Sequence, residues 1–286
     1  MNEKTALRRA LLDRRRGITP ERSRAAGIAL LARARDAGLL DAVSPGTGLA
    51  DKGLLDAGSP DAGLADRGWA DAGSPDADLV DRGLTDAGSI DAGASGAAPQ
   101  EAAGRGASGR RAPTVAAFEP IRGEIDTTPL IDAWLAAGVR VIVPASMTHV
   151  AWRRLRPTRR CGADAAGDAR GAADDGTTAD GRHENDDRAG ADATELGPDA
   201  LAEADLVLVP ALAVDAAGTR LGRGGGWYDR ALARRAAHAR VVAVCWPWEC
   251  VDRLPREPHD APVDAALTPA RVMPTGTWRP RCHGAD

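Results

Sequence analysis

The sequence is poor in aromatic residues and in lysine. Its 286 residues include seven tryptophans but only one tyrosine, one phenylalanine and two lysines. Sparse aromatic side chains disfavour a nucleic-acid-binding surface, on which bases would stack. No apolar run approaches the length that crosses a bilayer, and the basic N-terminus lacks the apolar core of a signal peptide. We therefore expect a cytoplasmic protein that binds neither membrane nor nucleic acid.

The sequence also lacks any cysteine motif. The four cysteines, at positions 161, 245, 250 and 282, form no Cys-x-x-Cys pair and have none of the histidine spacing of zinc sites. We expect reduced thiols, as in cytosolic proteins, and no disulfide framework.

Two acidic tracts interrupt the chain. The first, 41–98, repeats every fifteen residues, as in "DAGSPDAGLADRGWA" from Asp56 and "DAGSPDADLVDRGLT" from Asp71. The second, 162–200, has the same composition without the period. Neither has an apolar stripe at helical or strand spacing, so we expect two disordered insertions. A calcium-binding array is the alternative for the repeats, although they match neither the nonapeptide β-helix period nor the EF-hand ligand pattern.

Outside the two acidic tracts, the rest of the chain has a positive net charge. Each tract contains eleven acidic and three basic residues, so each carries a net charge of −8. Because the whole chain carries −4, the remaining 189 residues carry +12. A basic core suits an anionic partner such as a nucleotide or a polyanionic small molecule.

The core alternates helical and strand patterns. Helical spacing predicts helices over 3–16 and 19–38, the second with Thr19 as its N-cap and Pro20 in its first turn. The same signals predict helices from Pro129 and over 227–239, and apolar runs predict strands within 114–120, 139–146, 204–215 and 240–246. This series is typical of a parallel α/β fold. We predict a single three-layer α/β/α domain with a mostly parallel central sheet, formed by 1–40, 99–161 and 201–286.

The stretch "RLGRGGGWYDRAL", 220–232, places glycines between a predicted strand and a predicted helix. Glycine N–H groups beside a helix start suit a phosphate, and the guanidinium groups of Arg220 and Arg223 would add paired donors. The spacing matches neither the P-loop nor the dinucleotide fingerprint, so a flexible turn remains the alternative. Asp229 would either stabilise the helix start or hold magnesium. Lys4 and Arg8, four residues apart, project from one helix face and can reach one ligand together.

Extended to "LVLVPALAVDAAGTRLGRGGGWYDRAL", this stretch closely resembles the signature of the 5-formyltetrahydrofolate cyclo-ligase family, also called 5,10-methenyltetrahydrofolate synthetases. The segments "KTALR", "FEPIRGEIDTTPLI" and "PREPHDAPVDAALTP" resemble further family segments in the same order. Together they cover most of the 189-residue core. The sequence departs from the family pattern where Ala211 replaces glycine, Val214 replaces phenylalanine and Trp227 replaces tyrosine.

The resemblance implies a ligase of folate one-carbon metabolism that depends on ATP and magnesium. It would convert 5-formyltetrahydrofolate to 5,10-methenyltetrahydrofolate and release ADP and phosphate. The γ-phosphoryl group would go to the formyl oxygen, which activates the formyl carbon for attack by N10. Such a transfer needs positioning and charge neutralisation more than a protein nucleophile.

Matching positions imply the residues of the site. Arg223 and Tyr228 would be catalytic, Glu124 would accept pterin N–H groups, and Asp229 and Asp264 would hold magnesium. ATP would be bound by Lys4, Arg8, Arg220, Leu221, Gly222, Arg223, Gly224, Gly225, Gly226, Trp227 and Tyr228. The folate would be bound by Glu119, Glu124, Arg223, Gly224, Gly225, Gly226 and Trp227.

Other interpretations remain open from the sequence. His259 and Asp260 stay outside the predicted site, because a histidine on a proline-rich loop is more often exposed or structural. A non-catalytic nucleotide- or RNA-binding relative on the same fold is the alternative function. In a further alternative the acidic repeats act as a spacer or a calcium-dependent arm. We expect a monomer.

Overall fold

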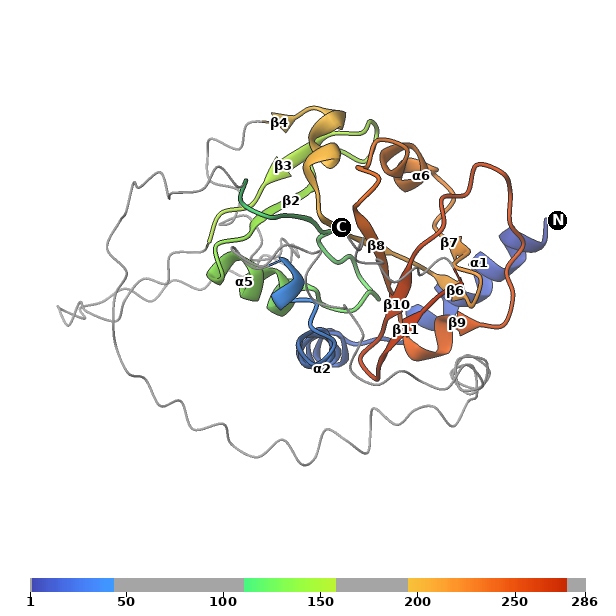
Figure 1. The fold of residues 1–286 in the computed structure, drawn as a ribbon. Coiled ribbons are helices and arrows are strands. Elements are labelled where there is room, and N and C mark those ends of the chain that lie inside the picture. The colour runs from blue at the N-terminus through green and yellow to red at the C-terminus, as the bar shows by residue number, and fades with distance from the viewer. Residues whose placement is uncertain (1, 44–110, 158–194, 277–286) are drawn as a thin grey trace, which may run out of the picture.

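The computed structural model describes residues 2–43, 111–157 and 195–276 (Figure 1). Most of both acidic tracts lies outside the described residues, and so do the predictions of disorder and calcium binding. Two pieces of these tracts belong to the fold: the 3-10 helix η1 (Asp41–Val43), whose Val43 is buried, and strand β4 (Glu195–Leu196). The described residues include 195–200, which the prediction assigned to the second insertion, and there Leu196 pairs with Trp152 at the sheet edge.

The central sheet has eight strands in the order β11-β10-β8-β5-β1-β2-β3-β4. Five neighbours, from β10 through β8, β5 and β1 to β2, are parallel, and the strands at both edges are antiparallel. Besides β4, the strands are β1 (Thr114–Ala116), β2 (Arg140–Pro144), β3 (Trp152–Arg154), β5 (Leu206–Pro210), β8 (Arg240–Val244), β10 (Ala265–Leu267) and β11 (Val272–Pro274). The prediction of an α/β fold with a mostly parallel sheet is confirmed.

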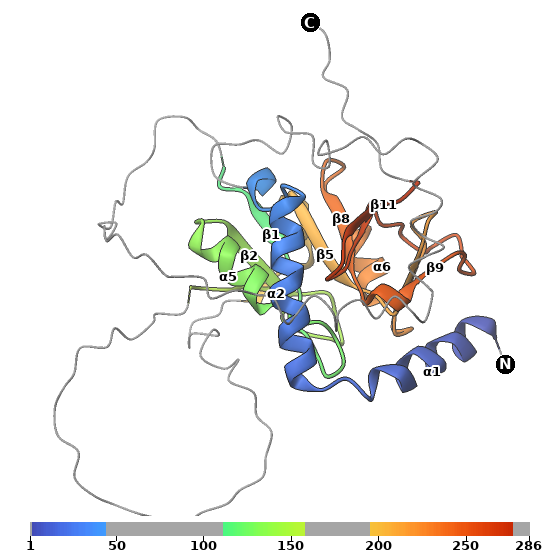
Figure 2. The same cartoon turned by 90° about the horizontal axis from the view of Figure 1, so that it is seen from below.

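Alternate residues of the strands enter two cores, one on each face of the sheet. Leu206 and Leu208 of β5 lie in one core with helices α2 (Pro20–Asp36) and α5 (Thr128–Ala136). Val207 and Val209 lie in the other core with helix α6 (Trp227–Leu232) and the 3-10 helix η5 (Pro198–Glu203). The strand period of two therefore places α2 and α5 on one side of the sheet and α6 on the other (Figure 1, Figure 2).

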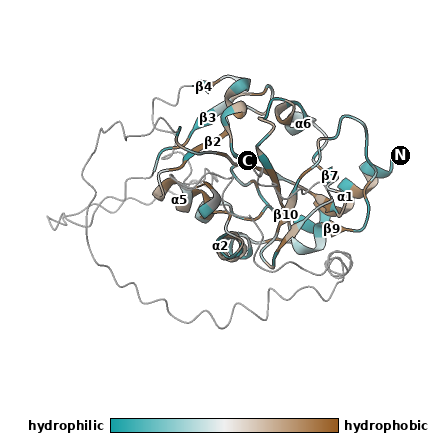
Figure 3. Ribbon diagram, viewed as in Figure 1, coloured by the Kyte–Doolittle hydropathy of each residue, from teal (hydrophilic) through white to brown (hydrophobic). Residues whose placement is uncertain are grey.

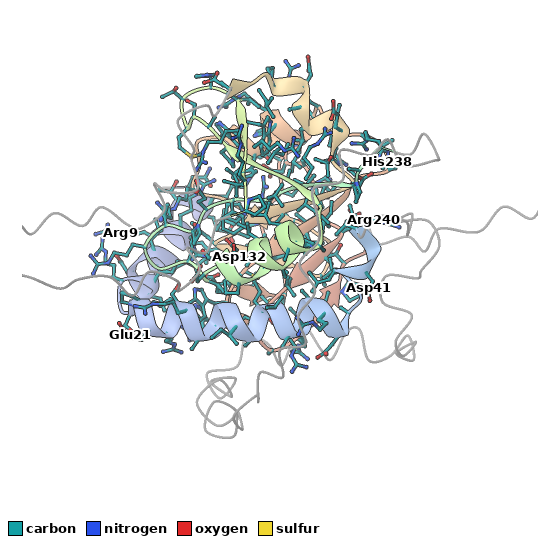
Figure 4. The ribbon with its side chains drawn as sticks, turned by 90° about the vertical axis from the view of Figure 1, so that its left-hand side faces the viewer. Arg9, Glu21, Asp41, Asp132, His238 and Arg240 are labelled. Carbon is teal, nitrogen blue, oxygen red and sulfur yellow. The ribbon has the colours of Figure 1, made fainter. Side chains whose placement is uncertain are left out.

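Hydropathy follows the same layers. Figure 3 shows apolar strands in the middle and mixed apolar and polar residues on the helices around them. Helix α2 begins as predicted, because Thr19 Oγ1 accepts the Arg22 N–H at 3.2 Å and Pro20 stands in the first turn. It runs across one face of the molecule, with Glu21 near its start (Figure 4). No helix in the described part of the chain is long and apolar enough to cross a membrane.

A second, three-stranded sheet carries the glycine-rich stretch. Its order is β7-β6-β9, with β6 (Ala213–Asp215), β7 (Arg220–Leu221) and β9 (Cys250–Val251). The prediction of one strand within 204–215 is wrong, because the chain leaves the central sheet after Pro210 and the Leu212 N–H bonds the Leu221 carbonyl instead. Helix α1 (Glu3–Arg15) packs Leu11 against residues of this sheet. Figure 2 shows the course of α1.

Two further predictions can be compared with the structure. The helix predicted over 227–239 ends at Leu232, after which the Arg234 N–H bonds the Ala231 carbonyl in a tighter turn. Cys245 and Cys250 are buried free thiols with their sulfur atoms 3.8 Å apart, in agreement with the expected absence of a disulfide between them. Cys161 and Cys282 lie outside the described residues.

Candidate active site

The glycine-rich loop joins β7 to α6. Gly224 and Gly226 have φ angles of 99° and 62°, a backbone region that favours glycine. A Cβ on Gly224 would come within 3.5 Å of the guanidinium carbon of Arg8. Because α6 has only six residues, its dipole adds little. An anion at this loop would therefore be attracted mainly by the cationic side chains around it.

One face of helix α1 carries several of these cations. Lys4, Arg8, Leu11 and Arg15 recur every three or four residues, so they line up along one side of the helix. Arg8 Nε donates to the Gly222 carbonyl at 2.9 Å, which ties the helix to the glycine-rich loop. The same helix face thus reaches the loop and, at its other end, the interior of the protein.

Arg220 is a buried guanidinium beneath the loop, with its side chain 3% exposed. Its Nη2 donates to Asp229 Oδ1 at 2.7 Å, and its guanidinium carbon lies 5.6 Å from the ring centre of Tyr228. Its Nε and Nη1 atoms are buried without a hydrogen-bond partner among the described residues. Burial lowers the pKa of Arg220, and the charges of Asp229 and Asp260 oppose that shift. Unpaired donors on a buried cation are costly, so this position suits an anionic ligand.

Lys4 lies in an acidic group near Arg220. Its Nζ donates to Asp260 Oδ2 at 2.7 Å and lies 3.4 Å from Glu257 Oε2. Oxygen and nitrogen atoms of Glu257, His259 and Asp260 lie within 4.8 Å of one another, as metal ligands do. Burial would raise the pKa of Asp260, but the hydrogen bond from Lys4 lowers it overall. We interpret this group as the anchor of the Lys4 ammonium, which already supplies the positive charge.

Glu124 belongs to a buried ionic cluster with Arg15 and Glu249, the last residue of the 3-10 helix η6 (Pro247–Glu249). Arg15 Nη1 lies 3.5 Å from Glu124 Oε1, and the Ile121 N–H donates to Glu124 Oε2 at 3.2 Å. Burial raises the pKa of Glu124, while Arg15, the Ile121 amide and the charge of Arg223 lower it. Glu124 also raises the pKa of the Tyr228 hydroxyl, which burial raises most. Glu124 is thus close enough to both Arg223 and Tyr228, two other predicted site residues, for their charges to interact with it.

Two other predicted folate-binding residues form hydrogen bonds with the side chain or backbone of other residues. Glu119 accepts a hydrogen bond from Arg153 Nη2. Trp227 Nε1 donates to the His149 carbonyl at 2.9 Å, and its ring packs edge-on against Trp152 with 5.2 Å between ring centres. Trp227, one of the three positions that depart from the family pattern, therefore makes a buried aromatic contact.

Asp264, the second predicted magnesium ligand, lies at the start of β10. Its Oδ2 accepts the Val241 N–H at 2.8 Å, at the first residues of the parallel neighbour β8. Burial raises its pKa, and the nearby charges of Arg240 and Arg235 oppose that shift. The described partners of Asp264 thus come from outside the glycine-rich loop, whereas Asp229 bonds Arg220 directly.

A model of the 5-formyltetrahydrofolate cyclo-ligase family matches residues 99–269. The chain belongs to this family. Its activity is that of a 5-formyltetrahydrofolate cyclo-ligase, an enzyme of folate one-carbon metabolism. The resemblance seen in the sequence is confirmed.

Individual relatives agree with this assignment. A cyclo-ligase of Mycolicibacterium smegmatis is 36% identical over 165 residues, which cover 55% of this chain and 74% of the relative. One of Escherichia coli K12 is 32% identical over 165 residues, which cover 56% of this chain and 79% of the relative. The NMR structure of 5,10-methenyltetrahydrofolate synthetase from Aquifex aeolicus has a TM-score of 0.53 and 20% identity, and the match covers 99% of this chain and 97% of that one. This last likeness supports the fold.

The cyclo-ligase structure adds residues that the sequence did not single out. Arg15 contacts Glu124 and is itself held by Glu249, and Arg153 holds Glu119. Asp260, which the sequence analysis left outside the site, holds Lys4. The helical spacing from Lys4 and Arg8 extends to Arg15 and could have identified it. No local pattern points to Glu249 or Arg153, because their partners are far away in the sequence.

Gly224→Ala is expected to weaken ATP binding by this cyclo-ligase. Its φ of 99° strains any side chain, although a Cβ would make only ordinary contact with the Arg8 guanidinium. We expect the KM for ATP to rise about tenfold or more, since backbone strain of ~1–3 kcal/mol would displace the loop. Gly225→Ala is the matched control with a smaller expected effect, because Gly225 has no positive φ and open space at its Cβ. Steady-state kinetics compare the two, and equal KM values would contradict the expectation.

Proposed function

We propose that this chain catalyses the ATP- and magnesium-dependent closure of 5-formyltetrahydrofolate to 5,10-methenyltetrahydrofolate, with release of ADP and phosphate. The observation that carries the proposal is the pair of unpartnered, buried nitrogen donors on Arg220, beside Asp229 and the glycine-rich loop. ATP would supply the phosphoryl group that activates the formyl oxygen, and magnesium would neutralise charge on the phosphates.

The cationic residues would bind the triphosphate. Arg220 would donate through Nε and Nη1, which burial keeps away from water, so each bond to a phosphate oxygen would be strong. Arg8 is held at the loop by the Gly222 carbonyl, and Lys4 is held nearby by Asp260. The loop amides of Gly224 to Gly226 would add neutral donors. These nitrogen donors match the acceptor oxygens of a triphosphate, which supports a binding role for the residues that carry them.

Asp229 would hold magnesium beside the phosphates. It lies in the first turn of α6 and accepts hydrogen bonds on Oδ1 from Arg220 and, at 3.4 Å, from the Ala261 N–H. Carboxylate oxygens are the protein ligands that magnesium prefers. Asp264 remains a second ligand predicted from the sequence.

The folate would lie toward Glu124, with Glu119 and Trp227 as further contacts. A carboxylate with spare lone pairs can accept the amino and ring N–H groups of a pterin. Arg223, on the exposed loop, acts electrostatically on Glu124 and would approach the formyl group from the phosphate side. With Tyr228 it would stabilise charge that develops during transfer, which is the main task of a protein in such a step. A monomeric state and a cytoplasmic location remain predictions.

One assay tests the proposal. Purified full-length protein, incubated with ATP, magnesium and 5-formyltetrahydrofolate, should produce the absorbance of the methenyl product and one ADP for each product formed. Omission of ATP, magnesium or folate should each abolish the signal. ATP binding without any product would overturn the proposal and favour a non-catalytic nucleotide-binding relative.

A further inference from the structure

We propose that Arg15 and Glu249 are positioning residues for the Glu124 carboxylate, so that one face of helix α1 serves both ends of the active site. The inference rests on the proposed function and goes beyond it, because neither residue belongs to the site derived from the family motifs. It assigns Arg15 and Glu249 a role in recognition of the folate without contact to it.

The Arg15 guanidinium is fixed by two parallel bonds. Its Nε donates to Glu249 Oε1 at 2.7 Å and its Nη2 donates to Glu249 Oε2 at 2.8 Å. Nη2 also donates to the Ala211 carbonyl, and Glu249 Oε2 accepts the Trp246 N–H at 2.9 Å. A bidentate pair of this kind sets the plane of the guanidinium. With its plane set, Nη1 faces Glu124.

Glu124 is held but is not saturated with donors. Its contact with Arg15 Nη1 is long, 3.5 Å, and its other oxygen accepts only the Ile121 N–H at 3.2 Å among its described partners. An ionised carboxylate offers about four lone-pair sites, so capacity remains for the N–H groups of a planar heterocycle. Because the cluster holds two carboxylates and one guanidinium, it has an excess of negative charge that such donors would relieve. The Glu124 carboxylate therefore has acceptor sites available for a ligand.

Burial makes the geometry rigid. The side chains of Arg15, Glu124 and Glu249 are 4%, 7% and 0% exposed. The charged and titratable groups that face Glu124 are Arg15 from α1, Glu249 from η6, Arg223 from the glycine-rich loop and Tyr228 from α6. A change at Arg15 or Glu249 would therefore alter both the place and the charge of Glu124.

Helix α1 spans the distance between the two ligands. Lys4 and Arg15 are separated by about 16 Å along the helix axis, from the rise of ~1.5 Å per residue. Arg8, between them, bonds the loop at Gly222, and Lys4 bonds Asp260. The nucleotide-facing and folate-facing cations thus stand on one rigid element.

Arg15→Lys tests the role of Arg15, with Arg16→Lys as matched control. Arg16 is on the exposed end of the same helix, where it pairs only with Asp13 at 2.9 Å among its described ion pairs. Lysine keeps the positive charge but cannot form the two parallel hydrogen bonds to Glu249. We therefore expect the KM for the folate to rise about tenfold or more, while kcat and the KM for ATP stay within about twofold of the unsubstituted protein. Arg16→Lys should leave all three constants unchanged. A general loss of kcat with an unchanged folate KM would overturn the proposal.

A double-mutant cycle separates positioning from packing. In a Glu124→Gln background the acceptor is already impaired, so Arg15→Lys should raise the folate KM less than about twofold further. An undiminished effect of Arg15→Lys in that background would show that it does not act through Glu124 and would overturn the proposal.

If Arg15→Lys fails to fold, Glu249→Gln tests the same proposal, because glutamine has the size of glutamate but no charge. Like charges raise each other's pKa, and loss of the Glu249 charge should lower the pKa of Glu124. The folate KM should change at low pH, where Glu124 takes up a proton, and Glu249→Gln should move this change to lower pH. An unchanged pH dependence of the folate KM would contradict the proposal. Absence of turnover in the unsubstituted protein would instead contradict the proposed function.

Discussion

Replacing Arg220 with methionine is expected to lower kcat/KM for ATP by about 10³-fold while the free energy of unfolding stays within about 1 kcal/mol. The two effects separate because of how Arg220 is buried. Its Nε and Nη1 have no partner among the described residues, so the folded protein carries two unsatisfied buried donors that methionine would remove. Its partner Asp229 is 24% exposed and would keep water and the Ala261 amide.

Steady-state kinetics and thermal unfolding of the same samples check this expectation. Arg220→Lys should lose less activity, because it keeps a charge but only one donor group for the phosphates. Arg234→Met is the matched control, since Arg234 pairs with Asp199 at the surface and should affect neither measurement. A large loss of stability with retained ATP kinetics would show that Arg220 serves the fold rather than the ligand.

Asp229→Asn is expected to abolish turnover at low magnesium and to raise the half-saturating magnesium concentration about 100-fold. The amide keeps the size of the carboxylate and an acceptor for Arg220, so the local structure should persist. It loses the negative charge that a divalent cation needs, and it leaves the Arg220 charge less compensated. Titration of the activity with magnesium measures the shift.

Asp264→Asn in the same titration decides the second predicted ligand. Asparagine can still accept the Val241 N–H, so the start of β8 should be unchanged. A raised magnesium requirement would then come from the lost charge and would support the sequence-based prediction. An unchanged requirement would refute it for Asp264, and an unchanged requirement in Asp229→Asn would refute the role of Asp229.

Much of the fold could be predicted because it depends on local patterns. Apolar runs predicted strands at β1, β2 and β8, and the Thr19 cap with Pro20 predicted the start of α2. The second sheet could not be predicted, since the partner of the Leu212 amide is Leu221, and this pairing depends on how the chain turns after Pro210. Periodicity finds an apolar run but not the sheet that it joins.

The family follows from motifs that can be read in the sequence alone, and so does the loop that carries the glycines and arginines. Which of those residues meet depends on the three-dimensional fold. It buried Arg220 with unpartnered donors, paired Lys4 with Asp260, and built the cluster of Arg15, Glu124 and Glu249 from three distant segments. Burial and charge pairing depend on contacts between residues up to 256 positions apart, and these contacts cannot be predicted from local spacing in the sequence.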